Sequence, residues 1–255
     1  METSHFFILG GQDNEMAEIQ SVLSSRQIPY IQPQSKWGEI LISIADLPPS
    51  ATNKQLVFVE CKPKTHVANA IIIDHHNHLS NQPSSLLQVL KLLNINPNLR
   101  QQLIASIDSD FLHHTIKKFP KHKSKILKIW ESGYRKNFNS DQEFETFKSK
   151  CQQLIDTAHR PFPDLLIIYE APQSMTLISA ICNLQNLACI LIVGSRESSN
   201  LKPCFYQGPK SVIQKLSQMT YERAYWGRRY FGCRAIPSHF ITSINQIYSS
   251  KLSKS

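Results

Sequence analysis

The sequence has no long hydrophobic run, and this absence excludes one class of protein. No apolar segment approaches the roughly 18 to 20 residues that cross a bilayer. The first twenty residues also lack the basic and apolar regions of a secretory signal. We therefore expect a cytoplasmic protein with no membrane partner.

Closely spaced cysteine pairs are missing as well. The six cysteines are scattered without a CxxC motif, which excludes a zinc knuckle and a thioredoxin motif. Several lie in apolar surroundings, Cys182 and Cys189 among them. A reduced thiol behaves there as a small hydrophobe, so we expect buried free thiols, as is usual in the cytoplasm.

Acidic residues are absent from two stretches that together hold 12 of the 28 basic residues. The net charge is +9, from 28 bases and 19 acids. Residues 111–130 hold six lysines and residues 223–255 six bases, neither with an acid, so the remaining chain nets −3. A uniformly basic coat is excluded. A hydrophobic content of 41% also indicates a folded core.

Short apolar runs predict an α/β fold. Continuous runs rich in Ile, Val and Phe are typical of strands buried on both faces of a parallel sheet. Four such runs occupy residues 5–9, 28–31, 56–59 and 70–73. Residues 14–24 place apolar side chains on one helical face between the first two runs, which predicts a βαβ unit.

Two domains are expected, with a boundary at a pair of prolines. Helical spacing continues over residues 84–93, 99–116 and 142–158, and Pro161 and Pro163 then exclude a helix. The strand and helix pattern restarts at residue 165. We predict a parallel-sheet domain over residues 1–158 and a smaller α/β, substrate-binding domain over residues 164–255.

One acid and several histidines follow the fourth apolar run directly. After Ile71 to Ile73 come Asp74, His75 and His76, with His78 two positions later. Open α/β sheets bind ligands at the carboxyl ends of their strands. Imidazole nitrogen and carboxylate oxygen together suit manganese, iron or zinc. The alternative is one capping histidine with the others solvated.

The Asp74-His75-His76 string resembles the signature of the DHH phosphoesterase superfamily, which includes exonucleases, nanoRNA and pAp phosphatases and cyclic-dinucleotide phosphodiesterases. The family's first motif, His-x-Asp-x-Asp, has its counterpart at Gly11 to Glu15, where the histidine is missing and the last acid is Glu. Glu60 stands where Asp is usual, and the segment around Asp108 resembles the family's fourth motif.

The resemblance implies roles for these residues. Two divalent ions, manganese with magnesium or iron as alternatives, would be bridged by Glu60 and further held by Asp13, Glu15, His75 and Asp108. The catalytic set would be Asp74, which orients His75, together with His75 itself and His76, which meets the phosphate. His78 is an alternative source of the missing nitrogen.

A second candidate site lies in the acid-free C-terminal stretch. The family's second domain binds substrate through a glycine-rich loop, and its one candidate here is residues 225–234. Arginine grips phosphate bidentately, and glycine lets the backbone approach a ligand. We therefore predict a phosphate clamp made of Arg223, Arg228, Arg229, Arg234, Gly227 and Gly232. The alternative is that Trp226 and Phe231 belong to the core and that the arginines only decorate it.

Together these features predict a metal-dependent phosphoesterase acting on a nucleotide or short oligonucleotide. The alternative is a degenerate family member that binds a phosphorylated ligand or nucleic acid without hydrolysis. Whether the protein forms a homodimer is left open by the sequence. A purely structural module fits poorly with acids gathered at strand ends.

Overall fold

The computed structural model describes residues 4–33, 41–136, 138–171, 178–179, 181–182, 185, 187, 189–194 and 201–252. These residues divide into two compact units, Met1–Asp108 and Ser109–Ser255. None of their helices is long and apolar enough to cross a membrane. Part of the strand and helix pattern expected from residue 165 onward lies outside the described residues.

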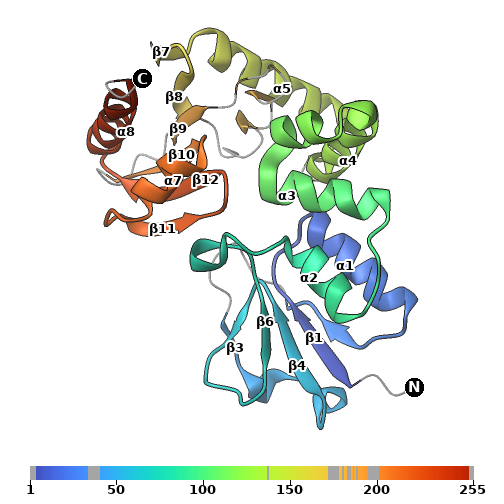
Figure 1. Cartoon of the computed structure of the whole chain (residues 1–255). Coiled ribbons are helices and arrows are strands. Elements are labelled where there is room, and N and C mark those ends of the chain that lie inside the picture. Colours follow the sequence, from blue (N-terminus) through green and yellow to red (C-terminus); the bar gives the residue numbers. More distant parts are fainter. Residues whose placement is uncertain are drawn as a thin grey trace. The chain divides into compact units, whose positions relative to one another are not determined.

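The first unit is built on a parallel sheet (Figure 1). Its strand order is β2-β1-β4-β6, and every neighbouring pair is parallel. The four strands are β1 (His5–Leu9), β2 (Tyr30–Ile31), β4 (Gln55–Val59) and β6 (Ile71–Ile73). The central strands β1 and β4 are almost entirely buried, as expected for a parallel sheet covered on both faces.

Helices and short elements complete this unit. The helices are α1 (Asn14–Ser25), α2 (Ser85–Leu92) and the start of α3 (Leu99–Lys118), with single turns η1 (Ile44–Asp46), η2 (Pro49–Ala51) and η3 (Asn77–Leu79). Two short strands, β3 (Leu41–Ile42) and β5 (Lys62–Pro63), pair in parallel. Helices α1 and α2 contact each other, and a hydrogen bond from the Leu86 amide to Glu15 joins their first turns.

The second unit contains a mixed six-stranded sheet of order β11-β12-β10-β9-β8-β7. Only β8 and β9 pair in parallel. The strands are β7 (His159–Phe162), β8 (Leu165–Ala171), β9 (Ile190–Gly194), β10 (Lys202–Gln207), β11 (Glu222–Trp226) and β12 (Tyr230–Ala235). The helical elements are η4 (Pro120–His122), α4 (Lys123–Arg135), α5 (Asp141–Asp156), α7 (Lys210–Leu216) and α8 (Pro237–Leu252).

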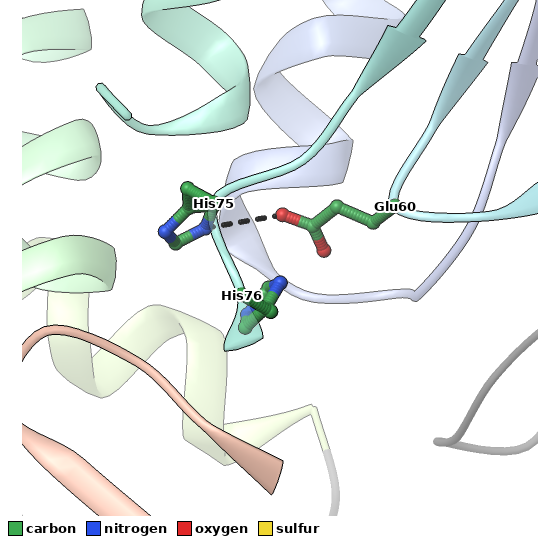
Figure 2. A group of neighbouring side chains, drawn as sticks. All are labelled: Glu60, His75 and His76. Carbon is green, nitrogen blue, oxygen red and sulfur yellow. Dashed lines mark ion pairs between the residues drawn. The ribbon is translucent and has the colours of Figure 1, made fainter. Parts of the chain in front are cut away.

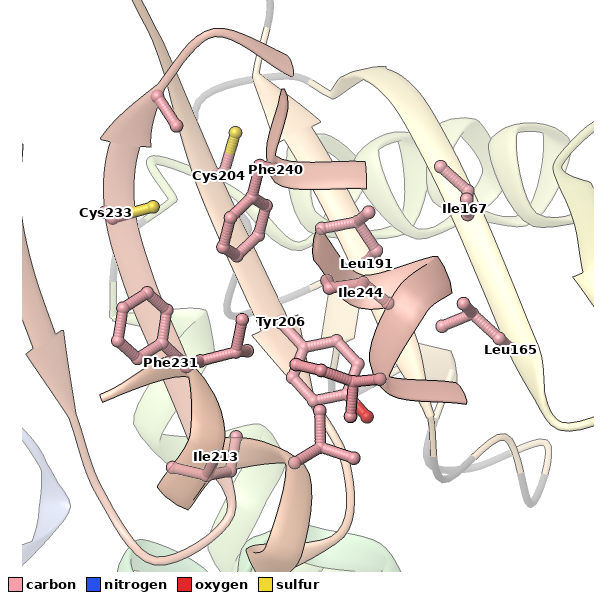
Figure 3. Close-up of a cluster of buried hydrophobic side chains, with 14 of the residues drawn as sticks. Leu165, Ile167, Leu191, Cys204, Tyr206, Ile213, Phe231, Cys233, Phe240 and Ile244 are labelled. Atoms are coloured by element: carbon pink, nitrogen blue, oxygen red, sulfur yellow. The ribbon is translucent and has the colours of Figure 1, made fainter. Parts of the chain in front are cut away.

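The core of the second unit lies between its sheet and two helices. Figure 3 shows Phe240 and Ile244 of α8 and Ile213 of α7 packed against side chains of β10 and β12. All three of these residues are buried. The five described cysteines other than Cys189 are buried, and all six are free thiols, as expected.

The predicted fold class, α/β in two domains with a parallel N-terminal sheet, is confirmed. The division differs in position, because it falls between Asp108 and Ser109 inside α3 and not at residues 158–164. Helix α5 contacts β8, so it belongs with the second sheet and makes the second unit the longer one. The proline-containing segment expected to be a break forms the edge strand β7, where a proline is tolerated.

Candidate metal centre

The register of the parallel sheet brings three chain segments to one edge. Leu9 pairs with Val59, and Val59 pairs with Ile73, so β1, β4 and β6 end side by side. The residues that follow these strands therefore leave the sheet at the same place. This local geometry gathers the first acidic motif, Glu60 and the Asp74–His76 string.

Glu60 leaves its strand through a left-handed turn. Its φ is 52°, a conformation that costs a residue with a Cβ about 1 to 2 kcal/mol. Its amide donates to the Ile73 carbonyl over 2.8 Å, which holds the turn against β6. The Ser85 hydroxyl donates to Glu60 Oε1 over 2.9 Å. The backbone of Glu60 is thus held by β6 and its side chain by α2.

Glu15 is placed by two helix starts. Asp13 caps α1 by accepting a hydrogen bond from the Met16 amide (2.9 Å), so Glu15 falls in the first turn. Its Oε1 accepts from the amide of Leu86 at the start of α2, over 3.0 Å. Its Oε2 points the other way, and the residue is only 1% exposed.

Three carboxylates converge on one ring nitrogen of His75. Nε2 lies 2.7 Å from Asp108 Oδ2, 3.2 Å from Glu60 Oε1 and 3.6 Å from Glu15 Oε2. Figure 2 shows the His75 ring facing Glu60, with His76 beside them. One donor atom from each of Glu15, Glu60, His75 and Asp108 lies within 4.8 Å of the others. We call these four residues the acid–histidine cluster.

The acid–histidine cluster contains polar atoms that the described protein does not satisfy. Glu15 Oε2, His75 Nε2 and Asp108 Oδ2 are buried, and no described residue makes a hydrogen bond of proper geometry to them. Leaving buried polar atoms without partners costs free energy. A divalent cation accepts the lone pairs of carboxylates and imidazole together, so these residues fit a metal ion.

The pKa shifts show the same crowding of negative charge. Burial, together with the charges of Glu60 and Asp108, raises the pKa of Asp13 to about 7. Burial and the charge of Asp108 also raise the pKa of Glu15 well above its usual value. Burial alone would lower the pKa of His75, but Asp108, Glu15 and Glu60 raise it strongly. Protons bound to these side chains thus offset part of the negative charge that a bound cation would otherwise offset.

Asp74 contacts His76, whereas the resemblance implied that it orients His75. Asp74 Oδ1 accepts from the His76 amide over 2.9 Å and lies 2.7 Å from His76 Nδ1. His76 also belongs to a second group of metal-compatible side chains, with Glu60 and His75. His78 lies exposed in η3 and is in neither group. The charges of Glu60 and Asp108 raise the pKa of Asp13, but Asp13 too is in neither group.

The predicted arginine clamp is divided by a β-hairpin. Glu222 pairs with Arg234 at one end of β11 and β12, where Arg223 and Arg234 both lie within 4 Å of the Glu222 carboxylate. The turn at the other end carries Arg228 and Arg229. Arg228 lies 3.4 Å from Asp110, and the Nε of Arg229 is buried without a hydrogen bond from the described residues.

The two glycines of the same hairpin accommodate aromatic rings. A Cβ at Gly227 would overlap the ring of Tyr230, and one at Gly232 would overlap the ring of Tyr225. Both glycines therefore have a structural reason within the hairpin itself. The segment predicted to be a glycine-rich loop is mostly strand.

Sequence reasoning missed Ser85 and the amide of Leu86, which hold the two buried glutamates. The available signal was the N-cap serine Ser84, which marks the start of α2 and hence its unpaired amides. Nothing in the sequence says which distant acid such a helix start will meet.

Comparison with known proteins finds a structural likeness but no sequence match. No protein-family model matches the sequence, and no curated protein matches it. A solved structure described as the pGpG-specific phosphodiesterase PggH from Vibrio cholerae matches 94% of this chain and 99% of its own, with a TM-score of 0.50 and 10% sequence identity. The two chains are therefore similar in their α/β fold.

Proposed function

We propose that this protein is a metal-dependent phosphoesterase that hydrolyses a phosphomonoester or phosphodiester of a nucleotide or short oligonucleotide. The observation that carries the proposal is the acid–histidine cluster with its three unsatisfied buried atoms. The fold likeness to a phosphodiesterase named for pGpG supports the same class of substrate.

In our proposal these residues would hold two ions. The two metal-compatible groups share Glu60 and His75, and Glu60 would be a ligand of both ions. Bound divalent ions, manganese in our proposal, would lower the pKa of a water molecule and stabilise charge on the phosphoryl group. The chain's part is to fix its donor atoms, through Leu86 on Glu15 and Ser85 on Glu60.

His76 is suited to meet the phosphate. Although burial opposes it, the contact with Asp74 raises the pKa of His76, which favours the protonated ring. A protonated imidazole donates from both nitrogens and attracts an anion. In our proposal residues 164–255 bind the rest of the substrate, with Arg228 and Arg229 at the hairpin turn as phosphate ligands.

The test is hydrolysis of pGpG, pApA, pAp and short RNA oligonucleotides in manganese, with and without chelator. We expect the wild type to cleave at least one, and His75→Ala to lose at least about 10- to 100-fold of that rate. The matched control is His159→Ala, an exposed histidine of β7 outside the cluster. Equal rates for His75→Ala and wild type would overturn the proposal.

A second function, binding without hydrolysis, is favoured by the position of the missing histidine. Gly11 stands there with φ of 64° and offers no ligand atom. Calorimetric titration of manganese separates the two functions. Metal binding that His75→Ala abolishes, without hydrolysis of any substrate, would support the binding function.

A further inference from the structure

A basic surface lies on α4 and the residues before it. The six lysines of residues 111–130 fall at the end of α3, in η4 and in α4. Lys121, Lys125 and Lys128 are exposed and line a shallow depression of about 300 Å³, together with His122 and Ser124. We call these five residues the lysine depression.

The opposite side of α4 is packed into the second unit. Ile126, Ile129 and Trp130 are each less than 5% exposed. The helix is therefore amphipathic, with its apolar side already covered. A helix that binds a membrane surface inserts its apolar side among the lipids, and α4 has no such side available. The exposed side of α4 carries lysines, so a polyanion is the partner whose charge complements it.

No carboxylate neutralises the lysine depression. Within the described part of the chain, none of the six lysines forms an ion pair, and Lys118 instead lies over the ring of Phe119 at 5.4 Å. The next acid along the chain, Glu131, lies 3.8 Å from Lys148. The positive charges of the depression are thus available to an external anion.

We propose that the lysine depression binds the phosphate backbone of single-stranded nucleic acid. Lys121, Lys125 and Lys128 line the same depression, so one phosphate chain can contact all three. Lysine binds phosphate as a point charge, and His122 offers a ring on which an unpaired base can stack. This site does not depend on the acid–histidine cluster.

The test measures binding of a fluorescein-labelled single-stranded RNA of about twelve nucleotides by anisotropy, in chelator, from about 50 to about 200 mM salt. The variant is Lys121→Ser/Lys125→Ser/Lys128→Ser. Its control, Lys64→Ser/Lys91→Ser/Lys150→Ser, removes the same charge from exposed positions elsewhere. Thermal melting verifies that both variants fold.

We expect the first variant to lower the slope of log affinity against log salt by about 2, since each phosphate contact contributes about 0.7 on single strands. Affinity near 100 mM salt should fall about 10-fold or more, and the control should bind like wild type. Replacing the three lysines with arginine should retain binding.

Three results would overturn the proposal. One is an equal loss of RNA affinity in the two triple variants, which would show that binding depends on net charge alone. Another is equal competition by poly-glutamate, which would indicate an acidic protein partner. The third is tighter binding of a duplex than of a single strand. Because the assay contains no metal, none of these results bears on hydrolysis.

Discussion

His75 gathers side chains from three parts of the first unit around one nitrogen atom. Glu15 comes from α1, Glu60 from the end of β4 and Asp108 from α3. Like charges this close raise one another's pKa unless a cation or a proton separates them. The metal-free protein should therefore be sensitive to pH through these residues.

Asp13→Asn tests that sensitivity. The amide oxygen of Asn can still cap α1 at Met16, so the helix start is retained. The Asp13 pKa is raised from 3.8 to about 7, so the folded state holds this proton more tightly than the unfolded state does. The stabilisation is complete below pH 3.8 and is lost as the pH rises to about 7.

Between these pH values we expect the unfolding free energy to shift in favour of Asp13→Asn by about 1 to 3 kcal/mol relative to wild type. Urea unfolding in chelator at several pH values measures the shift. Asp46→Asn, an exposed acid of the same unit, controls for the loss of one charge. A difference that stays constant with pH would contradict the prediction.

The roles of Asp74 and His75 show how much of the candidate site the residue pattern predicts. Their position after an apolar run predicts a place at the end of a strand, and the structure puts them after β6. Which of two adjacent histidines Asp74 contacts depends on the backbone turn after β6, where its carboxylate also accepts the His76 amide. Neither hydrophobic spacing nor residue type encodes that turn.

Helix α3 shows why the sequence could not reveal an interruption. Residues 99–116 have continuous helical spacing, yet Phe111 has φ 60° and ψ 170°. This region is occupied almost only by glycine and costs about 1 to 3 kcal/mol. The Phe111 ring packs edge-on against Tyr230 and Phe205, with centroids 5.5 and 6.4 Å apart. These partners are more than 90 residues away, so local propensity carries no sign of them.

The β10–β12 region allows a prediction about two glycines. A Cβ at Gly194 would lie 2.6 Å from Cγ of Pro203, whose ring is fixed in β10. A Cβ at Gly232 would meet the ring of Tyr225, whose side chain can rotate away because the residue is 44% exposed. We expect Gly194→Ala to cost about 1 to 3 kcal/mol, and Gly232→Ala below about 1 kcal/mol.

Chemical unfolding of both variants measures the difference. Gly232→Ala combined with Tyr225→Ala should lose the clash entirely, so the two changes should be non-additive. If Gly232→Ala were the more damaging of the two glycine variants, Tyr225 would have to be held more firmly than its exposure implies.

At the scale of the whole chain, the two units carry net charges of opposite sign. Residues 1–108 hold seven bases against nine acids, which gives −2, and residues 109–255 hold 21 bases against ten acids, which gives +11. The basic character read from the sequence therefore belongs to the second unit, while the acid–histidine cluster lies in the first.

This division predicts where manganese acts. A ligand that binds only the folded state stabilises the structure around it. We expect manganese to slow amide hydrogen exchange in peptides covering residues 10–15, 60–61, 74–76 and 86, and to leave β10 and β12 unchanged. Mass spectrometry of exchange, with His75→Ala as the control, measures this. Equal protection of both sheets would contradict a site confined to the first unit.

The boundary after Asp108 also has a consequence for the order in which the protein is made. Every member of the acid–histidine cluster has been added to the growing chain before Ser109, the first residue of the second unit. At about 5 to 20 residues per second, residues 109–255 take about 7 to 30 s to synthesise. The side chains of this cluster therefore all exist on the ribosome well before any of the basic hairpin has been translated.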